Sequence, residues 1–327
     1  MKTLFVGMGL VCCALQSQCL AGDEILSLVN GGDFIAPCAY TEGCAECGDV
    51  AANCDGCGNQ CPSWLKRSDH SFDEFISPMT NPVFFEDPRT LSEARFIFFN
   101  NTLPTSLGGQ NVQLYAMQLR AALTDRLSLI ATKDGFLVSD NALLNDGWAD
   151  VNAGLKYNLW NDPCSQTILS VGATYEASFG TPRTRQGNGD GVFHLFASGG
   201  AEIGDGAHWI TGSGFRLPAD TKAENQMWYW SNHLDKKIGD SKVYLIGETN
   251  WYHYMSSGTA LGLPIEGGDL FNLGSVGIAG HDLVTGAVGL KIKPSCQTEI
   301  GIVWETHLTD RQGITKDRLT VDWIFRY

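Results

Sequence analysis

The last eleven residues of the chain, Asp317-Arg-Leu-Thr-Val-Asp-Trp-Ile-Phe-Arg-Tyr327, decide the fold. In an extended strand, successive side chains point to opposite faces. One face of this stretch is apolar and largely aromatic, and it consists of Leu319, Val321, Trp323, Phe325 and Tyr327. The other face is polar except at Ile324. The stretch therefore predicts an amphipathic strand with one side suited to an apolar environment.

An amphipathic strand that ends the chain on an aromatic residue resembles the closing strand of bacterial outer-membrane β-barrels. In those barrels the apolar face meets lipid, and aromatic side chains gather at the membrane interfaces. The resemblance implies that the barrel assembly machinery would recognise this strand. A soluble β-domain can show the same alternation, so the rest of the chain has to distinguish the two folds.

The N-terminal end predicts export. Met1-Lys2 supplies a positive charge, residues 4–15 form an apolar run, and Cys19-Leu20-Ala21 precedes a suitable cleavage point, so residues 1–21 resemble a signal peptide. The run is shorter than the ~20 residues of a membrane-spanning helix. An exported chain without such a helix can enter lipid only as a closed barrel. The expected location is the outer membrane.

From residue 93 onward, alternating segments are separated by turn residues, most clearly over Ala149–Leu159 and Thr167–Phe179. Short connections alternate with long ones, as in outer-membrane barrels, whose short turns are periplasmic. If residues 256–282 are mostly loop, twelve strands place every short turn on one side. We predict an all-β fold: an antiparallel transmembrane barrel of about twelve strands over residues 93–327, with a Cys-rich N-terminal extension.

Composition agrees with a barrel and excludes one class of partner. The chain has 38 glycines, 9 tryptophans, 9 tyrosines and 16 phenylalanines, which is too many for an ordinary helical protein. Its formal net charge is −14, and an acidic chain of this kind does not bind nucleic acid.

Two stretches, residues 113–129 and 146–157, resemble a known family. Gln113-Leu-Tyr-Ala-Met-Gln-Leu-Arg-Ala-Ala-Leu-Thr-Asp-Arg-Leu-Ser-Leu129 closes on a Leu-Thr-Asp-Arg-Leu turn, and Asp146-Gly-Trp-Ala-Asp-Val-Asn-Ala-Gly-Leu-Lys-Tyr157 follows it. Together they resemble the outer-membrane transporters assigned to the phenol meta-cleavage degradation pathway. The resemblance implies a barrel that passes small solutes, hydrophobic or aromatic ones among them. The motifs are structural, and the Cys-rich region is no part of the family pattern.

If the apolar faces meet lipid, the polar faces line the interior. The candidate lumen-lining residues are Arg95, Arg120, Asp150, Lys156, Glu176, His194, Glu202, Glu248, Tyr252, Lys291, Glu299, Glu305, Asp322 and Arg326. Twelve strands lie between an eight-strand barrel, which its own side chains fill, and a wide sixteen-strand pore. Two interpretations stay open: the charges select the solute, or they pair across a narrow lumen and stabilise the barrel.

Residues 22–92 do not resemble barrel strands, and we expect them to be periplasmic. Six cysteines crowd into 24 residues, namely Cys38, Cys44, Cys47, Cys54, Cys57 and Cys61. Two CxxC pairs have zinc-site spacing, but export to an oxidising compartment favours disulfides over metal. Disulfide cross-linking to an envelope partner is a third option. The Phe- and Pro-rich stretch Phe72–Pro88 predicts a docking segment or plug, with an extended linker as the alternative.

A barrel hydrolase would need a Ser–His pair oriented by a third polar group. His194 with Ser198 and His233 with Ser231 are the nearest pairs by spacing, and neither stands in a known motif. We therefore predict no catalytic residue, no cofactor and no metal. The expected function is an outer-membrane channel or transporter for small solutes. The alternatives are a structural envelope protein cross-linked through its cysteines and, less favoured, a hydrolase.

Overall fold

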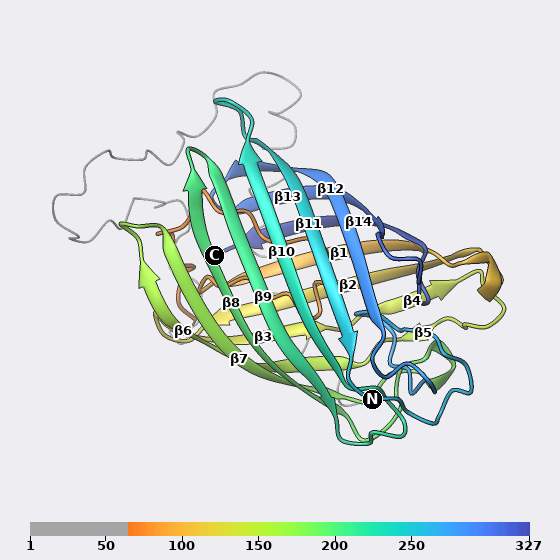
Figure 1. Ribbon diagram of the computed structural model, residues 1–327. Helices are drawn as coiled ribbons and strands as arrows, with labels where there is room; N and C mark the ends of the chain where they lie inside the picture. The colour runs from red at the N-terminus through yellow and green to blue at the C-terminus, as the bar shows by residue number, and fades with distance from the viewer. Residues whose placement is uncertain (1–64) are drawn as a thin grey trace. The chain divides into compact units, whose positions relative to one another are not determined.

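The computed structural model describes residues 65–327, so the predicted signal peptide and the six cysteines from Cys38 to Cys61 lie outside the described residues. Neighbouring strands pair antiparallel, and β1 (Glu93–Thr102) pairs with both β2 (Asn111–Ala122) and β14 (Asp317–Arg326). A sheet whose first and last strands pair is closed and has no free edge. Figure 1 shows the resulting barrel.

Fourteen strand elements build twelve wall strands. Both β3 (Leu127–Lys133) and β4 (Phe136–Ser139) pair with β2, so they form one wall strand with a kink between them. Gly135 lies at the kink with φ of 113°, and a Cβ there would come within 2.5 Å of the Tyr115 carbonyl oxygen. In the same way β5 (Gly147–Trp148) continues into β6 (Val151–Asp162). The predicted closed barrel of twelve strands is confirmed.

The remaining wall strands follow in chain order. They are β7 (Thr167–Ala177), β8 (Val192–Gly204), β9 (Ala207–Pro218), β10 (Met227–Lys237), β11 (Val243–Tyr254), β12 (Asp282–Ser295) and β13 (Thr298–His307), with 3₁₀ turns at Thr105–Leu107 and Pro182–Thr184. Short turns join strands at one end, here called the short-turn end, and long connections join them at the other, the long-loop end. The longest connection, residues 255–281 between β11 and β12, is the long loop predicted from the sequence.

The outer face of the wall is apolar on all twelve strands. In chain order, one exposed apolar side chain from each wall strand is Phe96, Tyr115, Leu129, Leu155, Leu169, Leu195, Phe215, Leu234, Leu245, Val288, Ile302 and Trp323. A soluble monomer rarely exposes so large a continuous apolar surface. The belt is the surface that a barrel presents to lipid. No helix within residues 65–327 is long and apolar enough to cross a membrane.

The inner face is polar, and β14 shows the alternation clearly. Leu319, Val321, Trp323 and Phe325 face outward, whereas Arg318, Thr320, Asp322 and Arg326 are buried inside. Ile324, the predicted exception, is also buried.

One assignment from the alternation is wrong: in Ala149–Leu159 the period of two residues puts Ala149 on the apolar, outward face with Val151 and Leu155. Ala149 is buried in an interior apolar cluster, because the chain bends between β5 and β6, where the Ala149 amide bonds to the Gly135 carbonyl.

Candidate functional site

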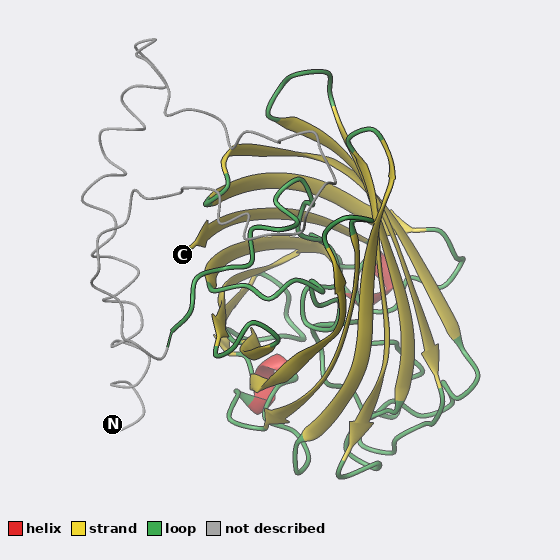
Figure 2. Ribbon diagram, turned by 90° about the vertical axis from the view of Figure 1, so that its left-hand side faces the viewer, coloured by secondary structure: helices red, strands yellow, loops and turns green. Residues whose placement is uncertain are grey.

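The interior of the barrel is occupied by residues 66–92, here called the N-terminal segment. It meets the wall first at the short-turn end, where the Lys66 amide bonds to the Ala122 carbonyl at 3.0 Å and the Ser68 amide bonds to the Tyr327 carbonyl at 2.6 Å. The segment returns to the same end, because the Tyr327 amide bonds to the Ser92 carbonyl at 2.8 Å. Figure 2 shows non-strand chain inside the ring of strands.

Between these points the segment crosses the lumen. The amides of Met79 and Thr80 donate to the Glu248 carboxylate at 2.7 and 2.6 Å, and Asn81 donates to the Ser231 hydroxyl at 2.9 Å. These partners belong to β11 and β10. The Pro82 carbonyl instead accepts from Gln118 on β2 at 2.8 Å. Contacts to strands on opposite sides of a closed ring mean that the segment spans the interior.

Glu86 fixes the returning half of the segment to a pair of wall cations. Arg120 on β2 grips its two carboxylate oxygens at 2.8 and 2.6 Å, and Lys156 on β6 lies 2.8 Å from one of them. Bidentate, charge-assisted hydrogen bonds of this kind are stronger than hydrogen bonds between neutral groups. Burial alone would raise the pKa of Glu86, but the charges of Arg120 and Lys156 outweigh it and lower the pKa to about 2.

A second ionic cluster ties the segment to β12, β13 and β14. Glu299 accepts from Arg326 at 2.5 Å and from the Ser77 amide at 3.2 Å, and it lies 3.2 Å from Lys291. Asp87 pairs within the segment with Arg89 at 2.7 Å. Buried charges are tolerated only when they are paired in this way.

The two Ser–His pairs that are nearest by spacing in the sequence do not form. Both ring nitrogens of His233 face carboxylates, Glu248 at 2.6 Å and Asp235 at 3.2 Å, so they are not available to Ser231. His194 bonds through Nε2 to the Tyr229 hydroxyl at 2.9 Å, and no bond to Ser198 occurs within the described residues. The geometry at these two pairs is therefore that of packed interior residues.

The long loop, residues 255–281, closes the other end of the lumen. Its Asp269 receives a bidentate pair of bonds from Arg318 on β14 at 2.9 and 2.8 Å. Asn272 donates to Asp150 at 2.7 Å and accepts from Lys133 and Arg216, each at 3.1 Å. One asparagine side chain thus joins the loop to several wall strands.

Apolar side chains of the long loop complete this closure. Leu270, Phe271 and Leu273 pack in a buried cluster with inward-facing residues of the wall. The cluster members on wall strands are Ile97, Phe99, Val112, Leu114 and Leu137, and those from the connections between strands are Leu103, Leu144, Ala149 and Ile314. The long-loop half of the lumen is therefore lined partly by apolar groups.

Most candidate lumen residues lie where the alternation predicts. Buried on the inner face are Arg95, Arg120, Asp150, Lys156, Glu176, His194, Glu248, Tyr252, Lys291, Glu299, Glu305, Asp322 and Arg326. Glu202 is a correction, because it is exposed at the end of β8 beside the Gly204–Gly206 turn, where the strand projects beyond the lumen. A role of any of these residues in selectivity stays a prediction.

Several residues of the closures escaped sequence reasoning. Arg318 shares the polar face of β14 with Asp322 and Arg326, so alternation could have found it. Glu86 and Asn272 lie in irregular chain, where no periodicity indicates which way a side chain points.

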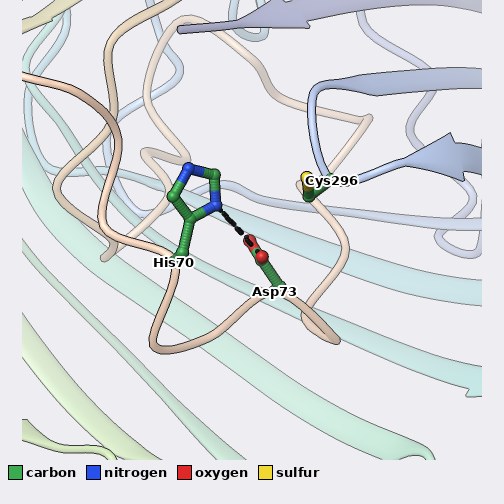
Figure 3. A group of neighbouring side chains, drawn as sticks. All are labelled: His70, Asp73 and Cys296. Carbon is green, nitrogen blue, oxygen red and sulfur yellow. Dashed lines mark hydrogen bonds and ion pairs between the residues drawn. The ribbon is translucent and has the colours of Figure 1, made fainter. Parts of the chain in front are cut away.

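A group at the short-turn end joins the segment to a turn. His70 Nδ1 lies 3.0 Å from the Asp73 carboxylate, and the Cys296 thiol is near both, with all three potential ligand atoms within 4.8 Å of one another (Figure 3). A metal ion would have to displace the His70–Asp73 hydrogen bond. Cys164 lies exposed in the turn after β6.

Comparison with known proteins finds similarity in structure but not in sequence. No family model and no curated protein matches the chain. A solved outer membrane channel from Pseudomonas putida is similar over 77% of this chain and 100% of its own, at 12% identity and a TM-score of 0.49. The NanC porin (8% identity, 72% and 100% covered, TM-score 0.47) and the KdgM porin (8%, 71% and 99%, 0.45) are also similar.

The fold is that of an outer-membrane β-barrel. Its closed wall and apolar belt establish this independently of the low identities, which carry no assignment of substrate. The resemblance to the phenol meta-cleavage transporters stays a prediction.

Proposed function

We propose that this protein is an outer-membrane channel for small solutes, held closed in this structure by the N-terminal segment and the long loop. The observation that carries the proposal is the distribution of polar side chains, which is the reverse of that in a soluble protein: an apolar outer belt surrounds an interior that contains paired charges. A barrel that served only as a membrane anchor would need no polar lumen and could be filled by apolar packing. The ionic contacts between wall and segment can be replaced by contacts with water, so this lumen can become hydrated when the segment leaves.

The solutes we propose are small, and aromatic or hydrophobic compounds are included. Twelve strands enclose less room than the sixteen or more of wide pores. The apolar cluster at the long-loop end offers a surface for such compounds, while the charged short-turn half would favour polar groups. The short turns support a periplasmic position for that half. Export, insertion by the barrel assembly machinery and disulfides in the Cys-rich region belong to the same proposal.

Single-channel recording tests the proposal. Protein comprising residues 22–327, refolded and heat-modifiable on gels, is added to a planar bilayer. We expect rare, discrete conductance steps, since the closures have to move before ions pass. The same protein unfolded before addition serves as the control. A folded, inserted barrel that never conducts, even with both closures shortened, would contradict a channel.

A further inference from the structure

The place where Glu86 and Phe84 of the N-terminal segment sit has the form of a ligand site built into the wall. Glu86 presents a carboxylate to Arg120 and Lys156, here called the clamp, and both cations are buried. Two residues earlier, Phe84 presents a phenyl ring to His194, Phe196 and Tyr229, here called the aromatic cage. The segment thus carries an aromatic ring and a carboxylate two residues apart, and the Glu86 amide bonds to the Phe84 carbonyl at 3.1 Å.

The geometry of the aromatic cage suits a flat ring. Phe84 stacks on Tyr229 at 5.5 Å between centroids and lies against His194 at 5.2 Å, while His194 stacks on Phe196 at 5.1 Å. Offset and edge contacts over such distances are the favoured geometries of aromatic pairs. The cage side chains come from the wall strands β8 and β10, so they stay in place when the segment leaves.

The clamp and the cage adjoin one another on the wall. Lys156, Gly172 and Phe196 occupy one row across β6, β7 and β8. A Cβ on Gly172 would lie 2.3 Å from the ring of Phe196, so the ring covers the glycine and extends toward Lys156. On the other side, Arg120 pairs directly with Ile130, which packs in the same cluster as Phe84. The two parts can therefore contact one small molecule.

The present occupant leaves one polar atom of the site unused. The Tyr229 hydroxyl donates to the Phe84 carbonyl at 2.7 Å, so it must accept from His194 Nε2. The neutral ring then has Nδ1 as an acceptor. Within the described residues this buried Nδ1 has no partner. A buried polar group without a partner is costly, which is expected of a site shaped for another molecule.

We propose that the clamp and the cage form a binding site for small aromatic carboxylates, and that Phe84 and Glu86 occupy it as an internal mimic in the closed state. This inference rests on the proposed channel function. A solute with both groups competes with Glu86 for Arg120 and with Phe84 for the cage. Binding then favours release of the segment, because one site cannot hold both occupants.

Calorimetric titration with benzoate tests the site in refolded residues 22–327. Emptying the site with Phe84→Ala and Glu86→Gln together is expected to tighten benzoate binding by about tenfold or more, since the internal competitor is gone. Adding Arg120→Gln should abolish that binding. Acetate, which lacks the ring, and benzyl alcohol, which lacks the charge, should each bind at least about tenfold more weakly than benzoate.

Glu74→Gln is the matched control, because it removes a segment carboxylate that contacts Lys237 and Tyr244 outside the clamp. We expect it to leave benzoate affinity unchanged. Equal affinity of the intact and emptied proteins, equal binding of the three probes, or an equal gain from Glu74→Gln would each overturn the proposal. If the double variant does not refold, Phe84→Ala alone provides the comparison.

The same proteins separate this proposal from the channel function. Selective benzoate binding without conductance in any variant would retain the site and reject the channel. Conductance without selective benzoate binding would retain the channel and reject the site.

Discussion

The two closures of the lumen are attached to the wall by similar contacts. The N-terminal segment is held by charge, since Glu86 and the amides of Ser77, Met79 and Thr80 meet ionised side chains of the wall. Its apolar side chains also pack with wall residues in three buried clusters, and these side chains are Phe72, Phe75, Ile76, Met79, Val83, Phe84 and Phe85. The long loop likewise combines one bidentate ion pair, Asp269 with Arg318, with an apolar cluster. The two closures differ in how the chain connects them to the wall.

This difference indicates that the segment is the closure suited to opening. The loop is joined to the wall at both of its ends, by β11 and β12, which limits how far it can move. The covalent chain joins the segment directly to the wall only at β1, and its other attachments are hydrogen bonds, ion pairs and packing contacts. Glu86 can also leave without stranding Arg120 fully, because Arg120 retains Glu93 on β1 at 2.9 Å. The other partners of Lys156 are the Asp87 and Arg89 carbonyls, which belong to the segment and leave with it.

The largest expected effect comes from removing each closure in turn. Deleting residues 66–90 should raise conductance more than shortening residues 259–278, because the segment spans the lumen between opposite walls. Deleting both should raise it most. Bilayer recordings on the three variants, each checked for heat-modifiability, make the comparison. If the shortened loop alone opens the pore fully while the segment is intact, the segment does not close it.

Single substitutions sharpen the contrast in stability. Arg318→Met should destabilise the barrel by about 3–5 kcal/mol, because it leaves Asp269 buried without its cation. Glu86→Gln should cost less, about 1–3 kcal/mol, because its cations keep other partners. Guanidinium unfolding of the refolded variants measures both. The reverse order would mean that the segment, rather than the loop, is the more firmly fixed closure.

The smallest expected effect is a difference in pH response. The pKa of Glu86 is lowered to about 2, so its contribution is present above pH 4.5 and is lost as the pH falls through 2. As the pH falls from 7 to 4, the stabilising free energy that ionised Glu86 contributes to the attachment of the segment should decrease by roughly 1 kcal/mol.

Glu224 lies in the connection that packs on the long loop, and its pKa shifts the other way. Burial, helped by the charge of Glu176, raises its pKa despite Arg216. Its stabilising contribution is therefore present below pH 4.5 and is lost as the pH rises through the raised pKa. Hydrogen exchange, corrected for intrinsic rates, should show acid weakening protection in residues 70–90 and not in residues 256–275. Parallel loss in both regions would contradict the assignment.

The barrel itself could be predicted because the direction of each side chain in a strand follows from the local sequence pattern. Alternation in β6, β7 and β14 assigns an inner and an outer face, and the order of short and long connections gives twelve strands. The same rule located most of the charged lining. It failed at Ala149 and Glu202, where a bend and a strand end remove the period on which the rule depends.

The occupant of the lumen could not be predicted to the residue. The composition of Phe72–Pro88 predicts a docking segment or plug, with an extended linker as the alternative. Nothing in that stretch indicates that Glu86 meets Arg120 or that Phe84 meets Tyr229. These contacts join positions far apart in the chain through irregular backbone. Asn272 in the long loop is the same case.

The sequence by itself therefore determined a closed barrel with an apolar outside and a charged inside, because side-chain direction in a strand repeats every two residues. Only the tertiary structure decided what fills the lumen and which charges pair there. Contacts made by irregular chain depend on its path through three dimensions, and no local period of the sequence encodes that path.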